Sequence, residues 1–327
     1  MNIVIIGASG HFAYALDGLN NNDEDQTIAF APGSVNEETD AVYKQELESH
    51  GLSYYDDFVK MLDEQKPEVA VINPHYYLNG KITLECLKRG IHCFVEKPLS
   101  FSLAELDEII SLYYTAGVHL TSMMCLRYHP AFYAACKAVE EGLIGEPVLI
   151  TAQKSYKMGL KPEWMQERKK FGGIISWVGS HSIDLIHWIG KGEIKEVLAH
   201  NTTVGNKGFG EVESAAICFY RLANGGQASV NIDYFRPEKA PTHGDDRLRV
   251  AGEKGVIEVM NDKAVLITEN QEPTEIPMED EVSMFGDFLN QIKTGSPCRI
   301  PAEDVFDVTR LCIKSQEAAD SESAIKL

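Results

Sequence analysis

Residues Asn2 to Ile6 form an apolar run that leads directly into the loop Gly7-Ala8-Ser9-Gly10. A strand that ends in a glycine turn and precedes a helical pattern is typical of the start of a parallel α/β sheet. Gly7 permits the tight turn, and Gly10 lets the backbone approach a pyrophosphate at the N-terminus of the helix. The loop therefore predicts a dinucleotide site, with a plain strand–helix turn as the alternative.

Strand and helix patterns alternate as far as about residue 125 and then change. Alternation predicts a parallel sheet with right-handed crossovers, whereas the later strand-like segments follow one another, with Asn224-Gly225-Gly226 as a hairpin signal. We predict an α/β protein with a doubly wound parallel Rossmann sheet over 1–123. We assign 124–327 to an α+β domain with an open, mostly antiparallel sheet. The segments predicted as strands are 2–6, 27–30, 68–72, 91–95, 118–125, 147–156, 194–204, 213–222, 227–234, 247–251 and 255–260. The main predicted helices run through Phe12 and Leu19 and over 36–50, 57–65, 82–89, 103–115, 130–141, 284–293 and 301–321.

Composition excludes several classes of protein. The formal net charge of −19 over 327 residues argues against binding nucleic acid or an anionic membrane surface. No apolar run approaches the ~20 residues of a membrane span, and the first strand does not resemble a signal peptide. Seven scattered cysteines without a C-x-x-C pair predict reduced thiols rather than disulfides or a metal site. We therefore expect a cytoplasmic protein without a metal ion.

The end of the second predicted strand bears on the choice of cofactor. NAD-binding folds usually carry an acidic residue there, but this chain has Ala31-Pro32-Gly33-Ser34. Ser34 can bond either a ribose hydroxyl or a 2′-phosphate. The nearby Glu37, Glu38 and Asp40 would repel a 2′-phosphate, so the sequence slightly favours NAD over NADP.

Glu96-Lys97-Pro98 follows the predicted strand 91–95 and so lies at the carboxyl edge of the sheet, where ligands bind in open α/β folds. Pro98 restricts the backbone of Lys97 and so fixes the direction of its ammonium. Such a lysine can donate to a carbonyl oxygen or exchange a proton with a hydroxyl. Taken alone, the tripeptide is also compatible with a surface lysine in a turn.

Five motifs occur in a fixed order, and together they are far more specific than any one of them. They are the glycine loop, Gly90-Ile91-His92-Cys93-Phe94-Val95-Glu96-Lys97-Pro98-Leu99, Arg127-Tyr128-His129-Pro130-Ala131, Gly145-Glu146-Pro147, and Gly172-Gly173 followed by Gly179-Ser180-His181-Ser182-Ile183-Asp184. Over nearly its whole length the chain resembles the Gfo/Idh/MocA family of NAD(P)-dependent oxidoreductases. The resemblance implies a Rossmann domain, an open-sheet domain, and hydride transfer at a secondary alcohol or ketone of a sugar, cyclitol or related polyol. The flat face of an open sheet also makes a homo-oligomer, a dimer or tetramer, plausible.

By position, Lys97 resembles the family's catalytic lysine and His181 resembles the histidine that takes or supplies the proton. Asp184 shares a helix face with His181 and is expected to orient the imidazole or stabilise its charge. A packing histidine and an ordinary ion pair are the alternatives. The expected cofactor contacts are Gly7, Ser9, Gly10, His11, Phe12, Pro32, Ser34, Asn73, Pro74, Tyr76, Glu96 and Lys97. The expected substrate contacts are Lys97, Lys154, Tyr156, Trp164, Trp177, His181 and Tyr234, of which Lys154 and Tyr156 alternate onto one strand face.

Trp177 stands where family members commonly carry an aspartate, four residues before the histidine, and its indole has one donor and no acceptor. Either another residue supplies the acid, or a less hydroxylated substrate stacks on Trp177, or catalysis is lost. The alternatives to a dehydrogenase are a non-catalytic dinucleotide-binding sensor or scaffold and a redox-neutral lyase or glycoside-cleaving enzyme. Asn79 departs from the histidine of many members, and the run Arg168-Lys169-Lys170 either steers an anionic substrate or forms a solvated turn.

Overall fold

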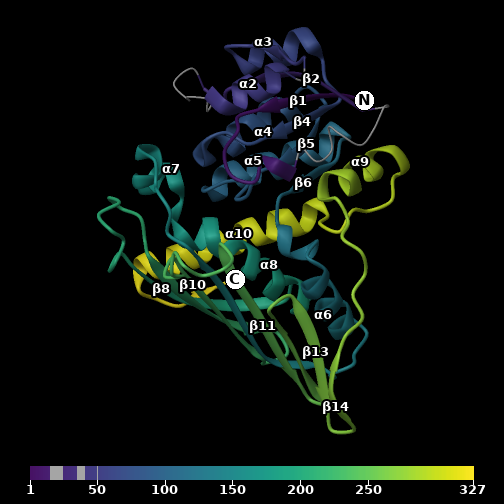
Figure 1. Cartoon of the computed structure of the whole chain (residues 1–327), viewed down its shortest axis with the longest axis vertical. Coiled ribbons are helices and arrows are strands. Elements are labelled where there is room, and N and C mark those ends of the chain that lie inside the picture. The colour runs from purple at the N-terminus through teal and green to yellow at the C-terminus, as the bar shows by residue number, and fades with distance from the viewer. Residues whose placement is uncertain (15–24, 35–40, 50) are drawn as a thin grey trace. The chain divides into compact units, whose positions relative to one another are not determined.

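The computed structural model describes residues 1–14, 25–34, 41–49 and 51–327 (Figure 1). It divides into two compact units, residues 1–123 with 282–306 and residues 124–281 with 307–327. The sequence analysis placed the domain boundary after residue 123 but assigned 282–306 to the second domain. In the described parts of the chain, no helix is both long and apolar enough to span a membrane.

The first unit contains a parallel sheet with the strand order β3-β2-β1-β4-β5-β6. Its strands are β1 (Asn2–Ile6), β2 (Gln26–Ala31), β3 (Ser53–Tyr54), β4 (Val69–Ile72), β5 (His92–Val95) and β6 (Leu120–Ser122). The strand order reverses between β1 and β4, and ligands of doubly wound folds bind at this switch point. The predicted Rossmann sheet is thus confirmed.

The helices of the first unit follow local signals in the sequence. The side chain of Asp57 accepts the backbone N–H of Lys60 at 2.8 Å and so caps one helix, and Ser102 caps the helix over Leu103–Ala116 in the same way. These helices are α2 (Ala41–Ser49), α3 (Phe58–Gln65), the short turn η1 (Tyr76–Leu78), α4 (Asn79–Leu87), α5 (Leu103–Ala116) and α9 (Met284–Thr294). Most of the helix predicted through Phe12 and Leu19 lies outside the described residues, as do 36–40 and 50 of the helix predicted over 36–50.

Helix α9 belongs to the first unit although the sequence analysis assigned it to the second domain. The rings of Phe285 and Phe288 lie 5.0 and 5.8 Å from the ring of Phe94 in β5. An amphipathic pattern shows that a helix has a buried face but not which sheet that face covers. This is why the sequence did not reveal the partner of α9.

The second unit contains a nine-stranded sheet with the order β14-β13-β12-β11-β7-β10-β9-β8-β15. Only β7 and β10 pair in parallel, so the predicted, mostly antiparallel sheet is confirmed. The strands are β7 (Pro147–Tyr156), β8 (Ile194–Thr202), β9 (Ala215–Leu222), β10 (Gln227–Asp233), β11 (Gly244–Gly252), β12 (Gly255–Met260), β13 (Lys263–Thr268), β14 (Gln271–Glu275) and β15 (Ile325–Lys326). The predicted hairpin at Asn224 joins β9 to β10.

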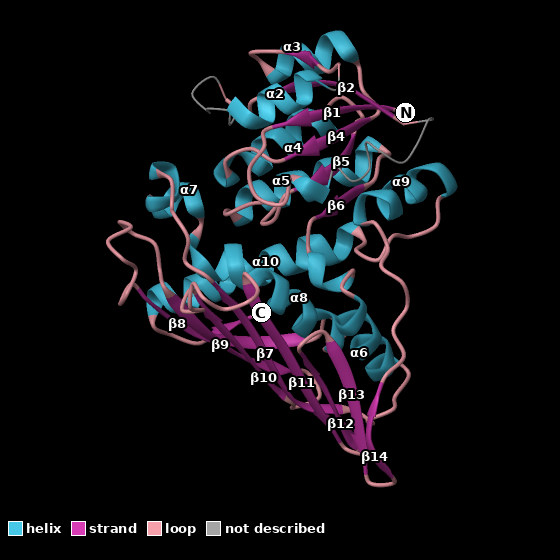
Figure 2. Cartoon of the chain, in the orientation of Figure 1, coloured by secondary structure: helices cyan, strands magenta, loops and turns pink. Residues whose placement is uncertain are grey.

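Helices cover one face of this sheet (Figure 2). The helical segments of the unit are η2 (Cys125–Arg127), α6 (Pro130–Glu140), η3 (Glu163–Gln166), α7 (Arg168–Phe171), the π-helical turn η4 (Ile175–Gly179), α8 (Ser180–Ile189) and α10 (Ala302–Ser321), whose first turn lies in the first unit. The strand predicted over 118–125 is wrong at its end, because the chain leaves β6 after Ser122 and forms η2. That turn places Cys125 and Arg127 against α8.

Candidate active site

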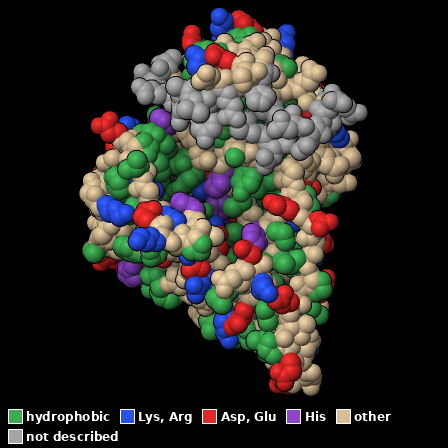
Figure 3. All heavy atoms as spheres, in the orientation of Figure 1, with side chains coloured by type: hydrophobic (Ala, Val, Ile, Leu, Met, Phe, Trp, Pro, Cys, Tyr) green, Lys and Arg blue, Asp and Glu red, His purple; other side chains and the backbone are tan. Residues whose placement is uncertain are grey.

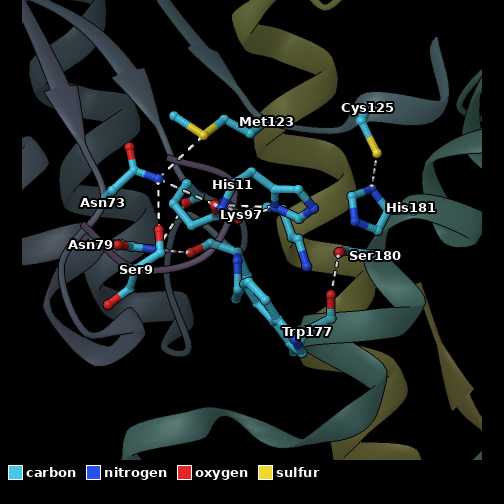
Figure 4. A network of polar contacts seen from close by, with 12 residues as sticks. Ser9, His11, Asn73, Asn79, Lys97, Met123, Cys125, Trp177, Ser180 and His181 are labelled. Carbon is cyan, nitrogen blue, oxygen red and sulfur yellow. Dashed lines mark hydrogen bonds and ion pairs between the residues drawn. The ribbon is translucent and has the colours of Figure 1, made fainter. Parts of the chain in front are cut away.

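The glycine loop after β1 is interlocked with the loop after β4 (Figure 4). Gly7 has φ +77°, and a Cβ at this position would lie 2.3 Å from the carbonyl oxygen of Asn73. The backbone N–H of Ser9 donates to that same oxygen at 2.7 Å, and Nδ2 of Asn73 donates back to the carbonyl of Ser9 at 3.0 Å. No residue other than glycine fits here, so Gly7 makes the tight turn that the sequence predicts and also lets the loop approach Asn73 closely.

The buried carboxylate of Glu96 organises the same two loops. It accepts the backbone N–H of His11 at 2.5 Å and that of Lys97 at 3.0 Å, and it also accepts Nδ2 of Asn73 at 3.3 Å. The ring Nδ1 of His11 lies 3.0 Å from the same carboxylate. Several donors thus satisfy the oxygens of this buried side chain. Glu96, which is one of the expected cofactor contacts, thus also holds the glycine loop in place.

Asn79 holds the segment around Lys97. Its Nδ2 donates to the carbonyl oxygens of Glu96 at 2.8 Å and of Pro98 at 2.9 Å, and the peptide bond between Lys97 and Pro98 is cis. Asn79, which stands where many family members have a histidine, therefore has a structural role in holding this segment. An amide with two N–H groups can bind two carbonyl oxygens at once.

The expected cofactor contacts follow the carboxyl ends of four neighbouring strands, β2, β1, β4 and β5. Pro32 and Ser34 come after β2, and Pro74 and Tyr76 come after β4. The side chain of Phe12 is buried, so only its backbone is available to a ligand of the loop. This edge contains the switch point of the sheet, where a dinucleotide fits the fold.

In the second unit, His181 lies in the first turn of α8. Its Nδ1 is 3.6 Å from Sγ of Cys125 (Figure 4). Cys125 is partly exposed, whereas the other six cysteines are buried. Trp177 lies in the π-helical turn before α8 and is largely buried, and its carbonyl accepts the hydroxyl of Ser180 at 3.1 Å. The sequence analysis missed Cys125, because the contact depends on where η2 meets α8.

Asp184 forms an ion pair with Arg127. Nη2 of Arg127 lies 2.7 Å from Oδ1 of Asp184, and Nε lies 2.9 Å from Oδ2. Both side chains are buried. A two-pronged, buried ion pair of this kind fixes the turn η2 on α8. The ion pair therefore helps to hold the segment that carries Cys125 next to His181.

Lys154 and Tyr156 lie together at the end of β7, as the alternation predicts. Nζ of Lys154 is 2.5 Å from Oδ2 of Asp246 and 4.9 Å from the ring centre of Tyr156. Burial disfavours the ammonium, but Tyr156, Cys125 and Asp246 hold the pKa of Lys154 above its ordinary value. Burial also raises the pKa of Tyr156 to about 12. Lys154 is thus a cation and Tyr156 a neutral hydrogen-bond donor near neutral pH.

Aromatic and basic side chains surround this strand end. Tyr234 follows β10 and is buried, and Nζ of Lys161 lies 4.0 Å from its ring centre. The ring of His243 lies 4.8 Å from that of Tyr156. Trp164 lies in the turn η3 and is half-buried. The sequence analysis missed Lys161 and Asp246, because the register that sets Asp246 opposite Lys154 is a long-range property of the sheet.

The basic run at 168–170 is held by acidic side chains of the second unit. Nη1 of Arg168 is 2.5 Å from Oε1 of Glu213, and its Nη2 is 3.0 Å from Asp320. Lys169 and Lys170 both pair with Glu167. These partners leave little positive charge to steer a substrate, which agrees with the alternative of a solvated turn.

Comparison with known proteins identifies both parts of the chain. Residues 1–123 match the model of an oxidoreductase family with an NAD-binding Rossmann fold, and residues 132–258 match the model of the GFO/IDH/MocA C-terminal domain. A myo-inositol 2-dehydrogenase from Thermotoga maritima is 23% identical over 318 residues, covering 93% of this chain and 92% of the relative.

Solved structures show the same architecture. A Thermotoga maritima protein described as an oxidoreductase is 39% identical, with a TM-score of 0.95 and complete coverage of both chains. An aldose-aldose oxidoreductase from Caulobacter crescentus, complexed with glycerol, has a TM-score of 0.84 at 19% identity, covers 100% of this chain and 99% of its own, and so supports the fold. On the two family models and the 39% identical structure, this chain belongs to the GFO/IDH/MocA family of NAD-binding oxidoreductases.

Proposed function

We propose that this oxidoreductase is an NAD(P)-dependent dehydrogenase or reductase that acts on a CH–OH group of a sugar, cyclitol or related polyol. The observation that carries the proposal is the interlocked glycine loop at the switch point of the first sheet, where Gly7 leaves no room for a Cβ beside Asn73. The relative named myo-inositol 2-dehydrogenase supports the substrate class. The bound nicotinamide would accept or donate the hydride.

The residues of the first unit fit a dinucleotide. Gly7 and Gly10 both have positive φ, so the backbone can turn its N–H groups outward beside a pyrophosphate. Asn73 and Glu96 fix that loop. We expect Ser34, which follows β2, to bond the ribose. We propose NAD rather than NADP, because the chain offers no arginine for a 2′-phosphate at the end of β2.

Proton transfer is assigned to this chain's own side chains. In oxidation, His181 accepts the hydroxyl proton at a ring nitrogen, and the ammonium of Lys97 donates a hydrogen bond to the same oxygen. Lys97 belongs to the first unit and His181 to the second. Trp177 presents an apolar face to that substrate in place of the usual aspartate.

The test is NADH formation from NAD⁺ with a panel of polyols, beginning with myo-inositol, and the reverse reaction with keto-sugars. We expect His181→Ala and Lys97→Met each to lower kcat by roughly 10²–10⁴-fold, and we expect His181→Ala to leave NADH binding unchanged. The exposed His200→Ala is the matched control. Tight NADH binding with no turnover in either direction would favour a sensor, and substrate conversion without net NADH would favour a redox-neutral enzyme.

We further propose that the protein is a cytoplasmic homo-oligomer, a dimer or tetramer. The face of the second sheet opposite α6 and α8 leaves Leu149, Phe219 and Met260 exposed. Apolar side chains on a flat sheet suit a second copy of the chain. Seven scattered cysteines without a C-x-x-C pair are typical of proteins in a reducing compartment. Light scattering of the wild type and of Phe219→Lys tests the assembly: an unchanged monomer in both would refute it.

A further inference from the structure

We propose that the second unit carries a subsite for a carboxylate group of the substrate, formed by Lys161 and Tyr234 with Lys157 and His243 around them. The substrate class would then be a sugar acid or hydroxy acid rather than a neutral polyol. That the bound anion is the substrate rests on the proposed function, whereas the anion site itself does not. Four independent features of the described residues lead to it.

The first feature is Lys161, which has no carboxylate partner among the described residues. Its Nζ lies on the face of the Tyr234 ring, 4.0 Å from the centre, and the side chain is half-buried. A ring face compensates a desolvated ammonium only in part. Burial accordingly lowers the pKa of Lys161 to about 8. An anion beside this ammonium would restore the interaction that burial has removed.

The second feature is the hydroxyl of Tyr234. It is buried and finds no hydrogen-bond partner among the residues that the structure describes. Buried hydroxyl groups in folded proteins are normally hydrogen-bonded, so this one is available to a ligand. Burial keeps the pKa of Tyr234 well above its usual range, so the hydroxyl remains a donor. Nζ of Lys161 lies over the same ring, so in this proposal the ammonium and the hydroxyl bind the two oxygens of one carboxylate.

The third feature is the charge balance of the neighbouring side chains. Asp246 is bound to Lys154, and Asp245 is bound to Arg247 and Arg236. Lys157 instead donates to the carbonyl oxygen of Ala240 at 2.7 Å and, like Lys161, has no acidic partner in the described parts of the chain. Positive charge is therefore in excess here, in a protein whose net charge is −19.

The pKa of His243 is affected by the same positive charges. Burial lowers its pKa, and Lys161, Lys157 and Lys154 lower it further, against a smaller opposite effect of Asp246. Figure 3 shows one face of the molecule, on which basic, acidic and histidine side chains are interspersed. The contrast with the run 168–170 is direct, because each cation of that run has an acidic partner.

The fourth feature links the subsite to the reacting histidine within the same unit. The ring of Tyr156 lies against that of His243, and Lys154 lies over the ring of Tyr156. Lys154 is also close enough to Cys125 for the thiol to influence its pKa, and Cys125 contacts His181. A substrate bound by its carboxylate at Lys161 and Tyr234 would thus extend along Tyr156 toward His181.

The test compares matched pairs of ligands by calorimetry on the full chain: D-gluconate with D-glucitol, D-glucuronate with D-glucose, and acetate as a minimal carboxylate. We expect the acids to bind at least about tenfold more tightly than their neutral partners, with affinity falling as salt rises. Lys161→Met should abolish this preference, Lys161→Arg should keep it, and the exposed, ion-paired Lys169→Met should not change it.

Equal affinity for acids and neutral partners, no binding of any of the carboxylates, or a preference that survives Lys161→Met would overturn the subsite. An NADH titration of the same samples separates this result from the proposed function. Carboxylate binding that depends on Lys161 in a protein that never binds NADH would uphold the subsite and refute the dehydrogenase. A protein that binds NADH and turns over only neutral polyols would uphold the dehydrogenase and refute the subsite.

Discussion

Glu96 fixes His11 of the glycine loop at two points, the backbone N–H at 2.5 Å and the ring Nδ1 at 3.0 Å. The same carboxylate accepts the N–H of Lys97, its neighbour in the chain. One buried acid therefore sets the shape of the cofactor loop and the path of the lysine segment together.

Removing this acid should weaken cofactor binding. Glu96→Ala leaves several buried N–H groups without an acceptor, at a cost of about 1–3 kcal/mol for each uncompensated group. We expect NADH affinity to fall by at least about tenfold and thermal stability to drop. Glu96→Gln keeps one acceptor and should lose less. Nicotinamide fluorescence measures the affinity, and the exposed Glu64→Ala is the control. Unchanged affinity in Glu96→Ala would show that the loop is held by other contacts.

The ion pair between Arg127 and Asp184 should be structural. Breaking one side of a buried pair typically costs about 3–5 kcal/mol, because the other charge is left buried and unpaired. We expect Asp184→Ala to lower the free energy of unfolding by that amount in a denaturant titration. Arg127→Met combined with Asp184→Ala should recover part of the loss. A variant Asp184→Ala that keeps its stability but loses turnover would instead assign Asp184 a direct part in proton transfer.

Cys125 should position His181, because its sulfur lies 3.6 Å from the imidazole Nδ1. Cys125→Ala removes this contact, and we expect a several-fold lower kcat with a shifted pH–rate profile and little change in KM. Cys125→Ser keeps a hydrogen-bonding group and should restore most of the rate. ¹⁵N spectra of His181 report the tautomer without any need for turnover. Identical spectra and pH profiles in the wild type and Cys125→Ala would mean that the contact has no influence on the histidine.

The lowered pKa of Lys161 should appear in the pH dependence of stability. Its pKa is about 8 in the folded protein and ~10.4 in an unfolded chain, so between these values the unfolded state binds more protons. Folding stability from this group therefore rises with pH through this window and is lowest below pH 8. Relative to Lys161→Met, the wild type should gain stability between pH 7 and 9. A difference in stability between the wild type and Lys161→Met that is constant from pH 7 to 9 would contradict the burial of the ammonium. For the control Lys169→Met, the difference from the wild type should not change with pH.

The sequence predicted those parts of the fold that local signals determine. The apolar run into Gly7 and the hairpin signal at Asn224 are short-range patterns, and the strand–helix alternation was enough to predict the parallel sheet. The contacts of the site depend instead on long-range register. Asp246 meets Lys154 only because β11 pairs with β7 across about ninety residues, and Cys125 meets His181 only because the strand before it ends early. The position of helix α9 could not be predicted either, because an amphipathic pattern does not show which sheet the buried face packs against.

The most direct test of the account is a titration of the purified wild type and of Gly7→Ala with NADH and with NADPH, followed by nicotinamide fluorescence. A Cβ at position 7 would lie 2.3 Å from the Asn73 carbonyl, so the variant should separate the two loops that hold the cofactor. We predict saturable binding in the micromolar range for the wild type, tighter for NADH, and a large loss of affinity in Gly7→Ala. A folded wild-type protein, free of co-purified dinucleotide, that binds neither NADH nor NADPH would contradict the central claim.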